Sequence, residues 1–189
     1  VDTGIWMELG NGDIHLTQNF RPYKAAKHIK SDDSFFKVAQ IPELCIYPGE
    51  INRRVRWEGM TQRAIALEDL ATARQHAYNS LADVVKKIKG HLKSPLADKH
   101  PVVAINFAKI LQTTDDRLVL EDAQGERIAF TEAGMSEEPA SCHLMWLLPE
   151  HMLHQQTLVA RFHHDLETRE LHIKPLSIIT ESQIYRLTL

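Results

Sequence analysis

The sequence predicts an α+β protein built from an N-terminal β-hairpin unit, a long central helix or helical pair, and a C-terminal antiparallel β-barrel-like unit. Three observations predict this class: a hairpin signal near the N-terminus, a helical repeat of apolar residues over 61–93, and at least five short apolar runs within 101–189. An OB-like barrel is one form that the last unit could take. The expected units are residues 1–60, 61–95 and 101–189. With 189 residues, 43% of them hydrophobic, the chain can bury a core.

The N-terminal hairpin is predicted from two strand-like runs that flank Gly10-Asn11-Gly12. An Asn-Gly pair between such runs is a strong signal for a tight hairpin turn. In the second run, the apolar Ile14 and Leu16 alternate with polar residues, which predicts a sheet with one wet face and places His15 on that face. After Pro22, residues 23–30 can form a short helix.

The central unit is predicted from apolar residues that recur at steps of three and four. These residues are Leu67, Leu70, Ala77, Leu81, Val84, Ile88 and Leu92. No Pro or Gly interrupts the stretch from Met60 to Lys89, so one long helix is permitted, while Asn79-Ser80 could divide it into two. Gly90 is available as a stop at the C-terminal end.

The C-terminal unit is predicted from apolar runs separated by turn residues. The predicted strands are residues 102–107, 118–120, 127–130, 144–148, 158–162 and 171–173. A turn at 122–125 joins the second and third of them, and residues 165–169 join the last two. This spacing is typical of a small barrel or sandwich.

The charge is distributed unevenly along the chain, although the formal net charge is only -3. Residues 21–63 carry nine Lys/Arg and five Asp/Glu, whereas residues 112–170 carry four Arg and twelve Asp/Glu. The first part would attract polyanions and the second would repel them. Solvated surfaces whose fields partly cancel explain the same pattern.

The sequence predicts a cytoplasmic protein with no membrane segment. No run approaches the roughly 18 apolar residues of a transmembrane helix, and Val1 opens a stretch without the basic and apolar regions of a signal peptide. The lack of an initiator Met indicates a processed chain or a piece of a longer one. The two cysteines, Cys45 and Cys142, lie far apart in sequence, which favours buried thiols in a reducing compartment over a single long-range bridge.

Histidine-rich residues 142–165 are the candidate metal site, with zinc as the candidate cofactor. The possible ligands are Cys142, His143, His151, His154 and His163. On a helix, the three-residue step from His151 to His154 would place both imidazoles on one face, and zinc prefers thiolate and imidazole ligands. The stretch contains no Cys-x-x-Cys and no His-Glu-x-x-His, so the ligands would have to come together from separate strands. A metal-dependent enzyme is therefore one alternative function, but no catalytic residue is assigned because no serine has a Gly-x-Ser-x-Gly context.

The arginine-rich stretch 51–57 is the candidate binding surface. If it is extended, Arg54 and Arg56 point to one side, while Arg53, Val55 and Trp57 point to the other with the apolar residues. Val55 and Trp57 are then expected in the core, and Arg53 needs a partner. The expected contacts to an acidic partner or to phosphates are Arg21, Lys24, Lys27, Arg54 and Arg56.

Several of these segments resemble a known family. Trp6 with its Gly-rich hairpin, Asn19-Phe20-Arg21-Pro22, residues 44–49 and residues 53–56 resemble the region outside the zinc finger in bacterial SWIM zinc-finger family proteins. Residues 118–130 resemble a later hairpin of the same proteins. The Cys-x-Cys…Cys-x-His motif that defines the family is absent, so no zinc ligand carries over. The resemblance implies a non-catalytic accessory region of an intracellular bacterial protein that acts in protein or nucleic-acid interactions.

The charge split and the lack of a catalytic motif together favour a non-enzymatic intracellular interaction module with a basic surface near residues 53–56. A protein partner is the leading expectation, because interfaces favour arginine and aromatic residues. Sequence-nonspecific nucleic-acid binding through Arg54 and Arg56 is the alternative.

Overall fold

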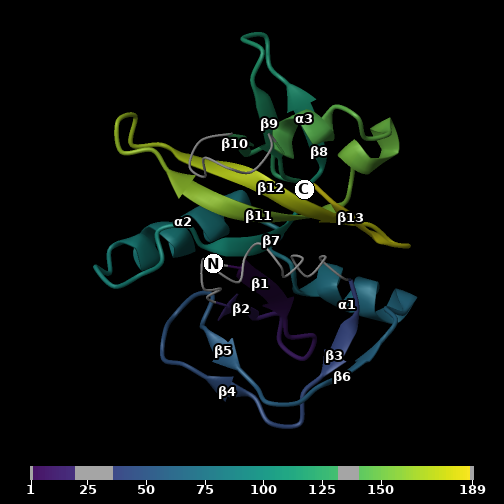
Figure 1. Cartoon of the computed structure of the whole chain (residues 1–189). Coiled ribbons are helices and arrows are strands. Elements are labelled where there is room, and N and C mark those ends of the chain that lie inside the picture. The colour runs from purple at the N-terminus through teal and green to yellow at the C-terminus, as the bar shows by residue number, and fades with distance from the viewer. Residues whose placement is uncertain (1, 20–35, 132–140, 188–189) are drawn as a thin grey trace, which may run out of the picture.

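The structure, a computed structural model, describes residues 2–19, 36–131 and 141–187 and has the predicted α+β class. Within the described residues, the helices are α1 (Leu67–His76), α2 (Leu81–Leu92), α3 (Ser141–Met145) and the 3-10 helix η1 (Glu150–Leu153). The strands of these same residues form one four-stranded, one three-stranded and three two-stranded sheets. Figure 1 shows the four-stranded sheet in the middle of the molecule, between the N-terminal strands and the three-stranded sheet. The helix expected over residues 23–30 lies outside the described residues.

The predicted N-terminal hairpin is confirmed. Strands β1 (Asp2–Met7) and β2 (Ile14–Asn19) pair antiparallel, and the pair of Met7 with Ile14 is the last before the turn. Gly12 has a φ of 80°, and a Cβ added there would lie 2.5 Å from the Cβ of His76. The turn therefore needs glycine for its backbone conformation and for its close contact with the end of α1.

Two small sheets follow in the part of the N-terminal region that the structure describes. Strand β3 (Val38–Gln40) pairs with β6 (Thr61–Arg63), and β4 (Cys45–Ile46) pairs with β5 (Val55–Arg56). Residues 61–63 are thus an exposed strand, and the helical region that was expected from residue 61 begins at Leu67. The apolar repeat also begins only at Leu67, so it contains no signal for an earlier start.

The central unit is a helical pair, the second of the two forms that the sequence allowed. Residues Ala77 to Ser80 separate α1 from α2, and the Ser80 side chain caps α2 by accepting a hydrogen bond from the Asp83 N–H at 3.2 Å. Helix α2 continues through Gly90 to Leu92, so Gly90 does not stop it. Packing outweighs the low helix propensity of glycine here, because His91 in the next position is buried.

The C-terminal strands form two sheets, and the described residues do not close into a barrel. The four-stranded sheet has the order β13-β12-β11-β7, and the three-stranded sheet has the order β10-β9-β8. Their bounds are β7 (Val102–Asn106), β8 (Lys109–Gln112), β9 (Leu118–Glu121), β10 (Arg127–Ala129), β11 (Thr157–His164), β12 (Leu171–Ile179) and β13 (Ile184–Arg186). A bridge between Phe130 and Ile173 joins the two sheets. The predicted hairpins β9–β10 and β11–β12 are confirmed.

Residues 144–148, predicted as a buried strand, instead contain the end of α3 and a turn. Met145 is only 1% exposed, but Trp146 and Leu147 are 47% and 78% exposed. A short apolar run does not distinguish a strand from a buried helical turn by its periodicity, which explains the wrong prediction.

The main core lies between α2 and the two C-terminal sheets. Its fully buried members include Val84, Ile88, Ile105, Leu120, Leu158, Phe162, Ile173 and Ile178. Helix α2 contributes every third or fourth residue, as the apolar repeat predicted.

The outer edge of β7 is occupied by side-chain and loop contacts. Tyr78, in the α1–α2 connection, donates its backbone N–H to the Ala104 carbonyl at 2.9 Å, and its backbone carbonyl accepts from the Asn106 N–H at 2.8 Å. At the other end of β7, the Asn52 side chain pairs with the backbone of Val102. The N-terminal unit and the helical pair are both joined to the central sheet in this way.

Candidate functional site

The predicted alternation over residues 53–57 is confirmed at its centre. Val55 in β5 is 6% exposed, whereas Arg54 and Arg56 are both exposed. Arg54 forms an isolated bridge with Leu16 of β2, which holds β5 against the N-terminal hairpin. The two arginines that the sequence selected therefore lie on the outside of a small, fixed sheet.

An aromatic side chain lies beside these arginines. The guanidinium of Arg54 lies over the ring of Tyr47, 5.7 Å from its centroid, and its Nη1 donates a long 3.5 Å hydrogen bond to Gln18 Oε1. Tyr47 is 46% exposed, whereas Ile46 pairs with Val55 and points to the other face of the two strands. We call the three residues that share the outer face, Tyr47, Arg54 and Arg56, the Tyr47–Arg54 surface.

Trp57 is half-buried and belongs to neither hydrophobic core of the described residues, so the prediction that it lies in the core is wrong. Its ring meets the ring of Trp6 edge to face, with centroids 4.9 Å apart and an interplanar angle of 86°. This geometry is favourable for two aromatic rings. Trp57 therefore fixes β5 against β1.

Arg53, which the alternation placed on the apolar side, has an acidic partner. Its Nη2 donates to Asp13 Oδ2 at 2.8 Å, with 32% of the arginine side chain and 49% of the aspartate side chain exposed. Asp13 lies in the β1–β2 turn, where its N–H donates to Asn11 Oδ1 at 2.8 Å. The pair neutralises Arg53, so Arg54 and Arg56 carry the free positive charge of the stretch.

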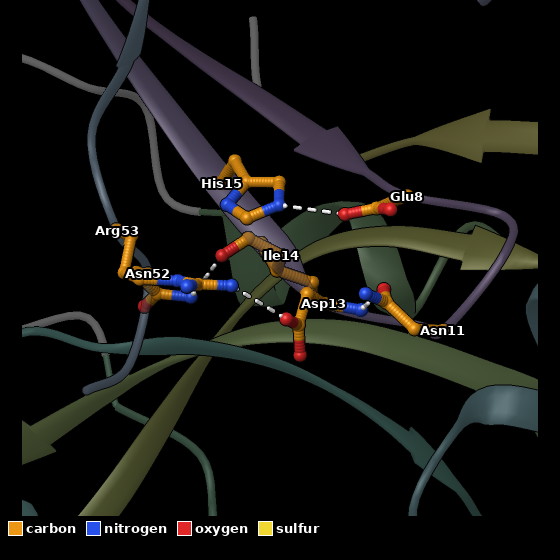
Figure 2. Close-up of polar contacts among 7 residues, drawn as sticks. All are labelled: Glu8, Asn11, Asp13, Ile14, His15, Asn52 and Arg53. Carbon is orange, nitrogen blue, oxygen red and sulfur yellow. Dashed lines mark hydrogen bonds and ion pairs between the residues drawn. The ribbon is translucent and has the colours of Figure 1, made fainter. Parts of the chain in front are cut away.

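Beside this pair, Glu8, Asp13 and His15 form a cluster that the sequence analysis missed. Figure 2 shows the three side chains at the base of the β1–β2 turn, with Asn52 and Arg53 next to them. One metal-binding atom from each of the three lies within 4.8 Å of the others, and no other such group occurs among the described residues. The Nε2 of His15 lies 3.1 Å from Glu8 Oε2.

His15 is buried rather than on a wet face, because only 3% of it is exposed. Asn52 covers this region from the loop before β5 and donates its Nδ2 to the carbonyls of Ile14 and Val102 at 3.3 and 2.8 Å. The Nδ1 of His15 has no hydrogen-bond partner among the described residues. Alternation within one strand does not reveal a covering loop that comes from 37 or more positions away, which is why the sequence prediction failed.

A cavity of about 60 Å³ adjoins the cluster. Its lining includes Asp13, His15, Tyr78, Lys87 and Val103. The Lys87 Nζ donates to the Tyr78 hydroxyl at 2.5 Å. The cavity can hold a few water molecules or an ion with its water ligands.

The described candidates of the histidine-rich stretch do not come together as one ligand group. The thiol of Cys142 in α3 is buried and donates to the Thr131 carbonyl at 3.7 Å. His151 in η1 and His154 after it are exposed, and His143 lies in α3.

The predicted contacts Arg21, Lys24 and Lys27 lie outside the described residues. Cys45, expected to be buried, is exposed, and the two cysteines do not form a disulfide.

His163 in β11 lies among other imidazoles. Its ring stacks on that of His100, with centroids 5.4 Å apart and planes 2° from parallel, and it pairs across the sheet with His172. Burial lowers the pKa of His163, and the positive charge that His100, His172 and His164 can carry lowers it further, against the opposing effect of Asp165. The neutral imidazole is therefore favoured in the folded state.

Comparison of the chain with protein-family models, with curated protein sequences and with solved structures gave no match. The resemblance to SWIM zinc-finger family proteins stays a prediction. None of the described helices is long and apolar enough to cross a membrane.

Proposed function

We propose that the chain is a non-enzymatic intracellular interaction module that binds an acidic segment of a partner protein through the Tyr47–Arg54 surface. The observation that carries the proposal is the stacking of Arg54 on the exposed Tyr47, with Arg56 exposed on the same face. Tyrosine and arginine are the residue types in which binding energy concentrates at protein interfaces. The ring also fixes the orientation of the Arg54 guanidinium before any partner arrives.

The charge of the surface supports an acidic partner. Arg54 and Arg56 have no ion-pair partner among the described residues, whereas Arg53 is paired with Asp13. A carboxylate can bind two N–H groups of a guanidinium at once, which gives directional recognition. The expected ligand is thus a segment in which Asp or Glu lies next to an apolar residue that packs on the exposed part of Tyr47.

The mixed character of the surface favours a protein over a nucleic acid. Phosphate-backbone binding relies on several cations along a groove, and the described part of this surface offers two, Arg54 and Arg56, next to the aromatic Tyr47. Base stacking would need an open aromatic face, but Arg54 lies over the ring of Tyr47. Both features fit a peptide ligand better than a polynucleotide.

Selection from a random-peptide display library tests the proposal. The native chain should enrich peptides that combine Asp or Glu with an aliphatic or aromatic residue. In titrations of an enriched peptide, Arg54→Glu with Arg56→Glu should weaken binding by at least about tenfold, the scale expected when hot-spot residues are removed. The charge-matched control, Lys86→Glu with Lys89→Glu on the exposed side of α2, should leave the affinity unchanged.

Two results would contradict the proposal. One is a selection that enriches no acidic peptide. The other is salt-sensitive binding of single- or double-stranded oligonucleotides that depends on Arg54 and Arg56, which would assign the surface to nucleic acid instead.

A further inference from the structure

We propose that Glu8, Asp13 and His15 bind one divalent transition-metal ion, with Zn²⁺ and Mn²⁺ as the ions that their donor atoms fit. The site is separate from the Tyr47–Arg54 surface and does not depend on its function. Imidazole nitrogen is a ligand for zinc and related ions, and carboxylate oxygen suits manganese and zinc. A set of one imidazole and two carboxylates combines the two preferences.

The geometry requires only small adjustments. Metal–ligand bonds of about 2.0–2.2 Å place ligand atoms roughly 3–4 Å apart, and the atoms of this cluster lie within 4.8 Å of one another. The side chains of Glu8 and Asp13 are 42% and 49% exposed and can rotate, while His15 is buried and held in place. The turn itself is fixed by backbone hydrogen bonds from Glu8 N to Asp13 O and from Gly12 N to Glu8 O, both 2.8 Å.

His15 is the buried member of the proposed ligand group. The residue is 3% exposed and lines the cavity together with Asp13. Histidines that bind metals use one ring nitrogen for the ion. In this cluster that nitrogen is Nε2, which lies 3.1 Å from the Glu8 carboxylate, the second proposed ligand.

Arg53 competes with the ion for Asp13. Their ion pair at 2.8 Å is partly exposed and therefore screened by solvent, so a divalent ion can displace it. Removal of the arginine should accordingly strengthen metal binding, whereas a purely structural role of the cluster predicts no such gain. The adjoining cavity provides space for the water ligands that complete the coordination around three protein ligands.

Titration calorimetry of the full chain, purified without an affinity tag and freed of metal with a chelator, tests the site. We expect one equivalent of Zn²⁺ or Mn²⁺ to bind. Glu8→Gln and Asp13→Asn should each weaken binding by at least about tenfold, and Arg53→Ala should strengthen it. Glu50→Gln is the matched control, because Glu50 is an exposed carboxylate that lines the same cavity but lies outside the cluster. Binding should also weaken as the pH falls, because protons compete for the ligands.

The proposal is overturned by the absence of saturable one-to-one binding. It is also overturned if Glu8→Gln and Asp13→Asn leave the affinity unchanged, or if His163→Asn abolishes binding, which would place the ion among the other histidines. Because Glu8 and Asp13 are exposed, their variants should remain folded, and circular dichroism checks this directly. His15→Asn can be tested in the same way. If that variant unfolds, the two carboxylate variants decide the result.

Discussion

The side-chain amide of Asn52 pairs in both directions with the backbone of Val102: its Nδ2 donates to the Val102 carbonyl at 2.8 Å, and its Oδ1 accepts from the Val102 N–H at 2.5 Å. Asn52 is 8% exposed and has a φ of 53°, a conformation that asparagine adopts more readily than most residues. One side chain thus takes the place of a strand residue at the edge of β7.

Asn52→Ala should lower the free energy of unfolding by about 2–4 kcal/mol, because it leaves buried backbone groups of Val102 and Ile14 without partners. Urea denaturation measures the change. Gln62→Ala, which removes an exposed amide from β6, should stay within about 0.5 kcal/mol of the native chain. Equal effects of the two substitutions would contradict the role of Asn52.

Asp122→Ala should destabilise the chain by a similar amount, about 2–4 kcal/mol. The carboxylate is 1% exposed and accepts hydrogen bonds from the N–H groups of Leu81, Gln124 and Glu126 at 2.8–2.9 Å. It therefore holds the first residue of α2 and the β9–β10 turn at the same time. Thermal unfolding measures the loss, and Glu126→Ala, which removes an exposed side chain from the same turn but keeps its N–H, should be close to neutral.

Gly12→Ala should destabilise the hairpin by about 2–3 kcal/mol, because a left-handed backbone and a crowded contact add their costs. The new Cβ would lie 2.5 Å from the Cβ of His76. At Gly59, in contrast, a Cβ meets nothing within 4 Å and φ is not in the left-handed region, so Gly59→Ala is the control and should not destabilise. Chemical denaturation of both variants gives the comparison.

The free energy of unfolding should decrease as the pH is lowered, over a range set by His163. The pKa of His163 is lowered in the folded state, so between that pKa and the unfolded value of about 6.5 the unfolded chain binds more protons. The contribution of His163 is therefore complete above about pH 6.5 and is lost as the pH falls below it. Urea midpoints measured from pH 7.5 to 5 should decline less steeply in His163→Gln, and an unchanged slope would contradict this role.

The sequence predicted the elements whose signals are local. The Asn11-Gly12 turn, the helical repeat of α2 and the β9–β10 and β11–β12 hairpins are specified by residues close in the chain, and each is confirmed. The exposure of Arg54 and Arg56 followed from strand alternation for the same reason.

The features that the sequence did not predict depend on contacts between distant residues. His15 is buried because Asn52 and its loop cover β2. The hairpin register alone places Glu8 and Asp13 on either side of one turn, which was an available signal for their proximity. His15 lies buried near them, with its Nδ1 unpartnered among the described residues. This position depends on packing between distant residues, which no local pattern encodes.

The contacts along β7 also bear on the solubility of the chain. A strand at the edge of a sheet exposes backbone groups that can pair with the edge of another molecule and start aggregation. At this edge, Asn52 engages Val102, and Tyr78 engages Ala104 and Asn106. The same contacts that join the N-terminal unit and the helical pair to the central sheet therefore protect its β7 edge from edge-to-edge assembly.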